Sequence, residues 1–235
     1  MTSPIILAVD TTSLETVTRW IEATRESVAV YKLGLEFFLT HGPDGVAKVQ
    51  RESDVEIFLD LKLHDIPNTV GAAAKAVHHL SPKFLTVHAS GGPAMVKGAV
   101  DALPHVDITA VTILTSLSEE DLFKVGFANP ALESAVALAD LSVRSGAKAI
   151  VCSPLEIEAI RATIGDATTI ITPGVRPAGT AGSDDQVRTM TPEAAIQAGA
   201  NYVVIGRPIT GQWSNGAQAM TDAARLIVEK IESAK

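Results

Sequence analysis

Short apolar runs alternate with longer segments of helical periodicity along the whole chain. The runs are rich in β-branched side chains, which is typical of strands buried on both faces of a parallel sheet. Each run is followed by a helix-forming segment, which is the order of a βα unit. We expect eight strands, at residues 5–10, 29–33, 56–62, 84–88, 108–114, 149–152, 169–172 and 202–205.

The boundaries of several helices are marked by residues suited to capping. Ser13 and Ser118 each precede a helical segment and can cap its free N–H groups, and acidic residues after Ser118 suit the positive end of a helix dipole. Pro67 fits the first turn of another helix, because its missing N–H is not needed there. Glycines that can adopt the left-handed C-terminal conformation stand where helices are expected to end: Gly126, Gly146, Gly165 and Gly199.

Eight βα units predict an α/β fold of the (β/α)8 TIM barrel type, with residues 1–235 as a single domain. The length of 235 residues is close to the ~250 that are usual for this barrel. A last helix at residues 217–232 is expected to pack on the outside, through apolar side chains at fourfold spacing: Ala223, Ile227 and Ile231. The small, polar segment 176–186 predicts a mobile loop after the seventh strand, at the end of the barrel where binding residues gather.

Composition narrows the class of partner. A net charge of −8 argues against general binding of nucleic acid, which requires a basic face. The single cysteine, Cys152, excludes an intramolecular disulfide framework and a multi-cysteine metal site. No stretch of the sequence resembles a secretory signal or a membrane span, so we expect a soluble protein of the reducing cytoplasm with no membrane partner.

The third expected strand and the residues just after it have the highest density of candidate catalytic side chains. Asp60 and Lys62 are two apart and therefore share one face of the strand, and Asp65 follows just past its end. Charged groups in an apolar frame lose hydration that only a close opposite charge can offset, so these residues serve each other or a ligand. A structural ion pair at the rim of the barrel is the alternative.

Other polar residues stand at the carboxyl ends of the expected strands. They are Asp10 on the first, Lys32 on the second, His88 on the fourth and Thr115 near the fifth. Gly206 and Arg207 follow the eighth strand, in the part of such barrels that usually binds phosphate. The glycine lets backbone N–H groups approach a phosphate, and the arginine adds a forked cationic donor. Arg176 and Gln186 flank the expected loop and can fold over the same ligand.

The remaining candidates favour structural roles. His64 is expected to pack or to lie in an interface, because strand alternation turns it away from Lys62. His88 can equally touch a ligand or be a satisfied rim residue. Neither a Gly-x-Gly-x-x-Gly motif nor a P-loop is present, so the sequence contains no motif that indicates chemistry with a nucleoside triphosphate or a nicotinamide cofactor.

In combination and order, these motifs closely resemble the orotidine 5'-phosphate decarboxylase family, in its shorter bacterial form. The resemblance covers essentially the whole chain and no functional position departs from it. It is carried by Leu7-Ala8-Val9-Asp10, Lys32-Leu33-Gly34, the run from Asp60 to Thr69, Leu114-Thr115-Ser116, Thr172-Pro173-Gly174-Val175-Arg176, Asp185-Gln186-Val187-Arg188 and Val204-Ile205-Gly206-Arg207-Pro208.

The resemblance implies a carboxy-lyase without cofactor or metal that converts orotidine 5'-monophosphate to uridine 5'-monophosphate and carbon dioxide, the last step of de novo pyrimidine nucleotide synthesis. It also implies a homodimer with shared active sites, in which Asp65 and Thr69 reach the ligand of the neighbouring subunit. By similarity, Asp10 and Lys32 hold the ribose, and Thr115, with Ser116 and Ser118 as alternatives, lies beside the pyrimidine. The phosphate contacts implied are Gly206, Arg207, Arg176 and Gln186.

The chemistry of this reaction agrees with the motif. Loss of carbon dioxide leaves an electron pair on C6 that the ring delocalises poorly, so a fixed cation must lie beside that carbon. Lys62 suits this role and can then donate the proton, while Asp60 orients it and favours its ammonium form. Lys32, Asp60, Lys62 and Asp65 form the implied charge array. Two alternatives remain open: a magnesium-dependent sugar-phosphate decarboxylase of the same superfamily, and a non-catalytic barrel that binds nucleotide phosphates.

Overall fold

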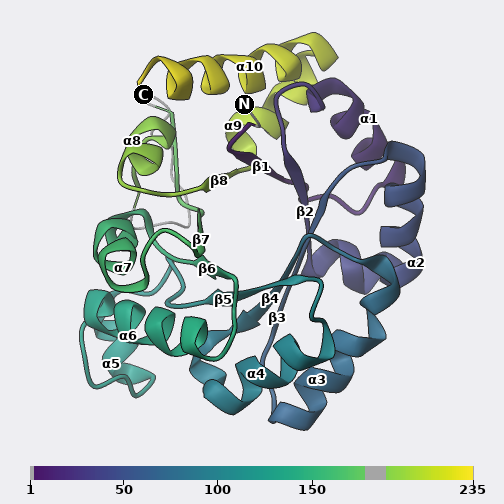
Figure 1. Ribbon diagram of the computed structural model, residues 1–235. Helices are drawn as coiled ribbons and strands as arrows, with labels where there is room; N and C mark the ends of the chain where they lie inside the picture. The colour runs from purple at the N-terminus through teal and green to yellow at the C-terminus, as the bar shows by residue number, and fades with distance from the viewer. Residues whose placement is uncertain (1–2, 178–188, 235) are drawn as a thin grey trace.

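Eight parallel strands close into a barrel in the computed structural model, which describes residues 3–177 and 189–234 (Figure 1). Each strand pairs with its neighbours in the sequence, and β1 closes the barrel against β8. The predicted fold class is therefore confirmed. The strands are β1 (Ile5–Ala8), β2 (Val30–Gly34), β3 (Ile57–Leu63), β4 (Phe84–His88), β5 (Asp107–Val111), β6 (Ala149–Val151), β7 (Thr169–Thr172) and β8 (Tyr202–Ile205).

Most strand bounds agree with the sequence pattern within one or two residues. The largest differences lie at the carboxyl ends of β1 and β5, which end before the apolar pattern does. Ile113 and Leu114 are no longer in β5 and instead line the cavity at the mouth of the barrel. Their apolar character therefore reflects this cavity, which a strand pattern cannot distinguish from a core.

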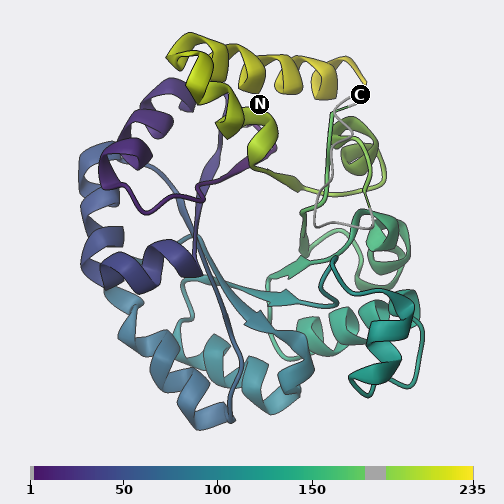
Figure 2. The ribbon, with the colours of Figure 1, turned by 180° about the vertical axis from the view of Figure 1, so that it is seen from behind.

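Helices surround the barrel in a ring that both views show (Figures 1 and 2). They are α1 (Leu14–Thr24), α2 (Leu35–Ser53), α3 (Pro67–Ala76), α4 (Pro93–Ala102), α5 (Glu119–Lys124), α6 (Ala131–Arg144), α7 (Ile157–Ile164), α8 (Pro192–Gln197), α9 (Arg207–Thr210) and α10 (Ala217–Ser233). None of the described helices is long and apolar enough to cross a membrane.

The predicted helix signals are confirmed where they can be followed. The Ser13 hydroxyl accepts the Thr16 N–H at 3.2 Å, Ser118 forms a capping box with Asp121, and Pro67 begins α3. The four glycines expected at helix ends all have positive φ. In α10 the buried alanine is Ala224 and not Ala223, because the buried positions follow 3.6 residues per turn and not a fixed spacing of four.

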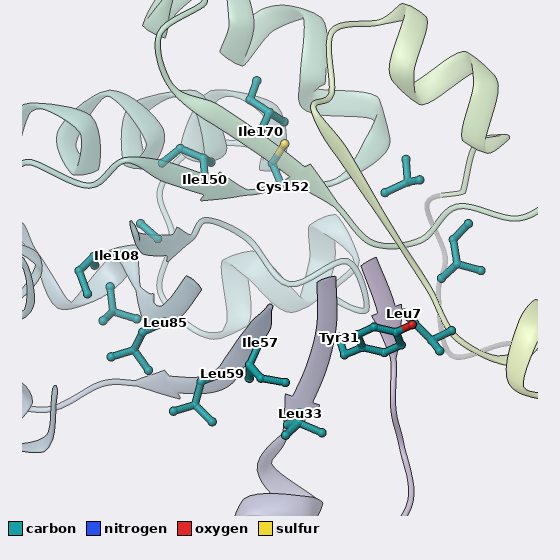
Figure 3. Packing of buried hydrophobic residues seen from close by; sticks show 14 of the residues in the cluster. Leu7, Tyr31, Leu33, Ile57, Leu59, Leu85, Ile108, Ile150, Cys152 and Ile170 are labelled. Atoms are coloured by element: carbon teal, nitrogen blue, oxygen red, sulfur yellow. The ribbon is translucent and has the colours of Figure 1, made fainter. Parts of the chain in front are cut away.

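Two apolar layers make up the core. The larger one lies between the sheet and the helices, where Leu7, Leu33, Leu59 and Leu85 point away from the barrel axis (Figure 3). The smaller one fills the barrel itself and includes Phe58 and Phe84, whose ring centroids are 5.6 Å apart. This inner layer packs the inside of the barrel, so it closes the bottom of any site formed at the carboxyl ends of the strands.

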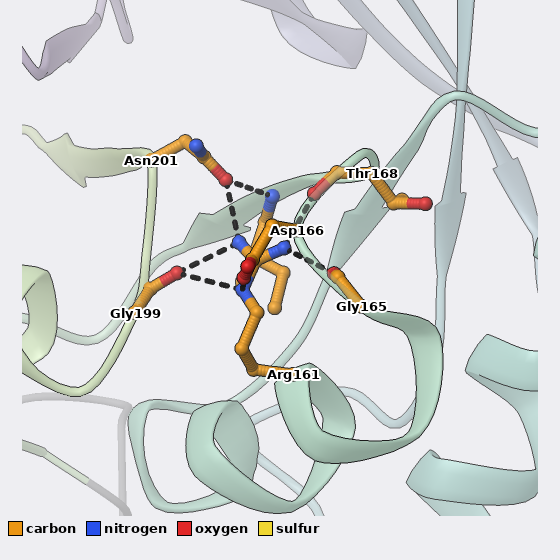
Figure 4. Close-up of polar contacts among 7 residues, drawn as sticks. Arg161, Gly165, Asp166, Thr168, Gly199 and Asn201 are labelled. Atoms are coloured by element: carbon orange, nitrogen blue, oxygen red, sulfur yellow. Dashed lines mark hydrogen bonds and ion pairs between the residues drawn. The ribbon is translucent and has the colours of Figure 1, made fainter.

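One arginine links several segments at the amino end of the barrel through hydrogen bonds. The Arg161 guanidinium, on α7, donates hydrogen bonds to the carbonyl groups of Gly165, Thr168 and Gly199 and to the side chain of Asn201 (Figure 4). These partners belong to the end of α7 and to the segments that enter β7 and β8. Arg161 therefore joins three segments at the end of the barrel opposite to the candidate site.

Candidate active site

A cavity of about 350 Å³ lies at the carboxyl ends of the strands. Charged and apolar side chains both line it, and three of the lining residues, Ala8, Phe58 and Val204, belong to the apolar cluster inside the barrel. The lining residues are Ala8, Asp10, Lys32, Phe58, Asp60, Lys62, Val111, Ile113, Leu114, Thr115, Val151, Cys152, Pro173, Gly174, Arg176, Val204, Gly206 and Arg207.

Asp60 lies between two lysines among the residues that line the cavity. Its Oδ1 atom is 2.8 Å from Lys62 Nζ, and its Oδ2 atom is 3.4 Å from Lys32 Nζ. Lys32 Nζ also lies 3.7 Å from Asp10 Oδ1. The structure thus brings together four of the polar residues selected from the sequence, with the Asp60 and Lys62 side chains in direct contact.

Burial distinguishes the members of this array. The Asp60 side chain is 11% exposed and Lys32 is 13% exposed, whereas Lys62 is 31% exposed and Asp10 is 68% exposed. Burial by itself raises the pKa of Asp60, but the charges of Lys32 and Lys62 and hydrogen bonds from Lys62 and Thr86 outweigh it and lower that pKa below its usual range. Asp60 is therefore an anion at neutral pH.

The cavity is cationic although the protein is acidic. Four basic and two acidic side chains line it, a net charge of +2, while the whole chain has a net charge of −8. Positive charge concentrated in a cleft with apolar walls attracts anions. A small ligand with several negative charges is the class of molecule that this cavity suits.

The ends of β7 and β8 supply half of the cationic charge. Gly174 and Arg176 follow β7, and Gly206 and Arg207 follow β8. Gly174 has φ +78°, a conformation that glycine adopts without strain. The Arg176 N–H donates to Met190 O at 2.9 Å, which fixes the backbone at this edge. Gln186, the remaining predicted residue of this group, lies outside the described residues.

Thr115 is the hydroxyl residue that lines the cavity after β5. Ser116 and Ser118 are not among the lining residues, and the Ser118 hydroxyl donates to Asp121 Oδ2 at 2.6 Å as part of the helix cap. Of the three alternatives left open by the sequence, the geometry thus favours Thr115.

Asp65 and Thr69 lie outside the cavity of their own chain. Both are exposed: Asp65 lies between β3 and α3, and Thr69 lies in the first turn of α3. The Asp65 carboxylate accepts the Ile66 N–H at 2.6 Å. Within one chain, then, the structure does not add Asp65 to the array of Lys32, Asp60 and Lys62.

Two histidines lie beside the array. The rings of His64 and His88 are 5.4 Å apart, and His64 is exposed, so the packing and interface roles expected for His64 both stay predictions. Burial, followed by the charges of His64 and Lys62, lowers the pKa of His88. Neither ring lines the cavity.

Sequence reasoning missed Thr86, whose hydroxyl donates to Asp60 Oδ1 at 3.0 Å. Its position two residues before His88, on the inward face of β4, was a usable signal. It also missed the apolar wall of the cavity, because Val111 and Val151 are typical of any buried strand.

Fold and site together define a (β/α)8-barrel enzyme with a cationic cavity at the carboxyl ends of its strands. The family model described as orotidine 5'-phosphate decarboxylase / HUMPS family matches residues 3–222, and the chain belongs to this family. The family resemblance and the enzyme class inferred from the motifs are confirmed.

Individual relatives agree with the family assignment. An orotidine 5'-phosphate decarboxylase of Thermobifida fusca is 51% identical over 226 residues, covering 96% of this chain and 97% of the relative. One of Frankia casuarinae is 43% identical over 241 residues, covering 95% and 88%. The crystal structure of the enzyme named orotidine 5'-phosphate decarboxylase from Lactobacillus acidophilus superposes with a TM-score of 0.81 at 35% identity, covering 96% of this chain and 99% of the other.

Proposed function

We propose that this protein decarboxylates orotidine 5'-monophosphate to uridine 5'-monophosphate and carbon dioxide. The observation that carries this proposal is the Lys32–Asp60–Lys62 array at the wall of a cationic cavity. The substrate has a carboxylate of −1 charge and a phosphate monoester of about −2 charge, and a ligand of this negative charge suits a cavity whose lining side chains have a net charge of +2. The names of the relatives support the same substrate.

Lys62 is the proposed proton donor. When the bond between C6 and the carboxylate breaks, its electron pair remains on C6 and carbon dioxide leaves. The Lys62 ammonium stabilises this charge and transfers a proton to C6, and the neutral amine regains a proton from water. A cation held in place before the reaction is effective because it need not reorganise in the transition state.

Asp60 is proposed to keep that ammonium oriented and charged. The Nζ to Oδ1 distance of 2.8 Å is that of a charge-assisted hydrogen bond, and the buried carboxylate favours the ammonium form of its partner. Asp60 also lies where a substrate carboxylate would approach. Repulsion of that carboxylate in the ground state is a separate contribution that this proposal does not require.

The remaining contacts follow from the ends of the other strands. We assign the ribose to Asp10 and Lys32, the pyrimidine to Thr115, and the phosphate to Gly206, Arg207 and Arg176, with Gln186 as a further phosphate contact. Arg207 at the β8 end offers a forked donor that matches phosphate oxygens. Phosphate binding far from C6 supplies free energy that orders the reacting end of the site.

The protein is proposed to act as a cytoplasmic, cofactor-independent homodimer with shared sites. Asp65 and Thr69 are exposed and outside their own cavity, so they are available to complete the cavity of a second subunit. Exposed apolar side chains near them, such as Ile66 at 66% exposure, support contact with a partner.

The direct test follows the ultraviolet absorbance of orotidine 5'-monophosphate with purified protein and EDTA. We expect loss of substrate and formation of uridine 5'-monophosphate. Activity that EDTA abolishes and magnesium restores indicates the sugar-phosphate branch of the superfamily. Binding of the nucleotide without any product indicates a non-catalytic barrel. Either result overturns the proposal.

Two variants test the roles assigned to the charges. Lys62→Ala is expected to lose turnover while it still binds uridine 5'-monophosphate in calorimetry, because the proton donor is gone but the phosphate contacts remain. Lys97→Ala is the control, since Lys97 pairs with Asp101 on the exposed face of α4. Near-normal turnover by Lys62→Ala contradicts the mechanism.

Mixing subunits tests the shared site. Asp65→Ala and Lys62→Ala proteins are each expected to be inactive, and heterodimers of the two regain one complete site. Recovered activity after subunit exchange supports the proposal. Persistent inactivity, with exchange shown by mass spectrometry of tagged subunits, contradicts it.

A further inference from the structure

The backbone of Lys62 has an unusual conformation for a residue in a strand. Three described residues other than glycine have positive φ, and two of them, Asp54 and Ser81, end helical turns. Lys62, with φ +48°, lies in β3. A side chain makes this region unfavourable, so surrounding contacts must hold the residue in it.

An irregularity between β3 and β4 accompanies this conformation. Leu59 pairs with Leu85 but Leu63 pairs with Val87, so four steps along β3 match only two along β4. The extra length is a bulge that contains both Asp60 and Lys62. The bulge interrupts the regular ladder, and the Lys62 N–H instead donates to the Thr86 hydroxyl at 2.8 Å.

The Thr86 hydroxyl makes a second hydrogen bond, to Asp60 Oδ1 at 3.0 Å. An amide N–H can only donate and an ionised carboxylate can only accept, so the hydroxyl proton points to Asp60 and a lone pair faces Lys62 N. The Thr86 hydroxyl therefore acts as a donor to Asp60 and as an acceptor from Lys62. Thr86 is fully buried, and a group of the same shape without the oxygen cannot replace it.

These contacts close a ring around the proposed proton donor. The Asp60 oxygen that accepts from Thr86 is the same atom that accepts from Lys62 Nζ at 2.8 Å. The Lys62 side chain is therefore fixed at its ammonium end through Asp60 and at its backbone through the amide. Thr86 is fully buried and does not line the cavity, so we do not expect it to contact a substrate.

We propose that Thr86 is a positioning residue whose hydroxyl sets the location of the Lys62 ammonium by holding both the Lys62 backbone and the Asp60 carboxylate. This inference rests on the proposed decarboxylation for its effect on rate, while the geometry it describes is independent of the substrate. Small displacements of a catalytic group lower the rate of the chemical step more than they weaken binding.

The kinetic test compares Thr86→Val, Thr86→Ser and Thr109→Val. Thr109 is the matched control: it is fully buried, pairs in register with Thr86, and its hydroxyl bonds only to Asp107 O in its own strand among the contacts described. Thr86→Val is expected to lower kcat about 10- to 100-fold, the range for a lost hydrogen bond to a charged group, with KM changed less than about threefold. Thr86→Ser is expected to recover most of kcat, and Thr109→Val to keep it.

A second measurement does not depend on activity. The ¹³C signal of the Asp60 carboxyl group, followed against pH, is expected to report a higher pKa in Thr86→Val than in wild type, because one donor to that carboxylate is lost. Thr86→Ser and Thr109→Val are expected to titrate as wild type does. If Thr86→Val does not fold, Thr86→Ala takes its place with the same expectations.

Two results overturn the inference: a kcat of Thr86→Val equal to that of Thr109→Val, or equal losses in Thr86→Val and Thr86→Ser. Wild-type protein that lacks decarboxylase activity contradicts the proposed function instead. In that case the titration of Asp60 still decides the role of Thr86.

Discussion

The Asp60→Asn substitution tests the charge array most directly, because it removes one charge with almost no change of shape. Asp60 Oδ1 is 2.8 Å from Lys62 Nζ and Oδ2 is 3.4 Å from Lys32 Nζ. At an effective dielectric constant of about 20, the two attractions amount to about 6 and about 5 kcal/mol before desolvation is subtracted. Removing one partner from a buried ionic group typically costs about 3–5 kcal/mol. We expect Asp60→Asn to lower the free energy of unfolding by about 3 kcal/mol.

The lowered pKa of Asp60 determines how the stability difference between wild type and Asp60→Asn changes with pH. Lys32, Lys62 and Thr86 lower the pKa of folded Asp60 below the ordinary value of 3.8, despite the opposing effect of burial. A lowered pKa contributes stability that is fully present above the ordinary value and is lost as the pH falls through the folded pKa. The difference between wild type and Asp60→Asn is therefore expected at neutral pH and to diminish below about pH 4.

Urea unfolding at pH 7 and at acid pH, at one protein concentration, measures this difference. Asp101→Asn is the control: Asp101 Oδ1 lies at the same 2.8 Å from Lys97 Nζ, but its side chain is 60% exposed. Such surface pairs contribute about 0.2–1 kcal/mol. If Asp60→Asn costs no more than Asp101→Asn at pH 7, or if its cost does not depend on pH, the electrostatic reasoning about the array is wrong.

Three further substitutions test other parts of the fold. Arg161→Lys cannot reproduce the forked hydrogen bonds at the amino end of the barrel, so we expect the free energy of unfolding in urea to fall by about 2–3 kcal/mol with kcat unchanged. A lowered kcat in the folded variant contradicts a purely structural role of Arg161. Burial raises the pKa of Tyr31 to about 12 from 10.0, so wild type is expected to lose stability between pH 10 and pH 12 and Tyr31→Phe to lose less; equal alkaline loss in both proteins refutes it. A Cβ added at Gly98 would lie 2.9 Å from Pro67 O, so Gly98→Ala is expected to push α3 away from α4 and to lower the free energy of unfolding by about 1–3 kcal/mol. Gly211 has open space around it, so Gly211→Ala is expected to lower the free energy of unfolding by less than about 1 kcal/mol. Equal melting temperatures of the two variants contradict this expectation.

Local signals in the sequence predicted most of the architecture. Ser13 caps α1 because a hydroxyl before a helix satisfies a free N–H group in any fold. The strand runs are recognisable because a sheet covered on both faces requires continuous apolar sequence. These are short-range requirements, and a sequence pattern contains them in full. The choice of Asp60 and Lys62 was also local, since it needed only the alternation of a strand.

Other features depend on residues that meet only when the barrel closes. Thr86 follows Asp60 by 26 positions, and its hydrogen bonds exist because β4 pairs with β3 across a bulge. The left-handed backbone of Lys62 and the net charge of the cavity likewise depend on several strands at once. Strand periodicity says nothing about such a shift in register.

By itself the sequence determined the barrel, the family and the acidic and basic residues of the site, because each of these depends on local pattern or on motif. Only the tertiary structure decided that Thr115 and not Ser118 faces the cavity, that Asp65 lies outside it, and that a buried hydroxyl supports the central lysine. The physical reason is that burial and hydrogen-bond partners are set by contacts between distant segments, which are made only when all eight strands are in place.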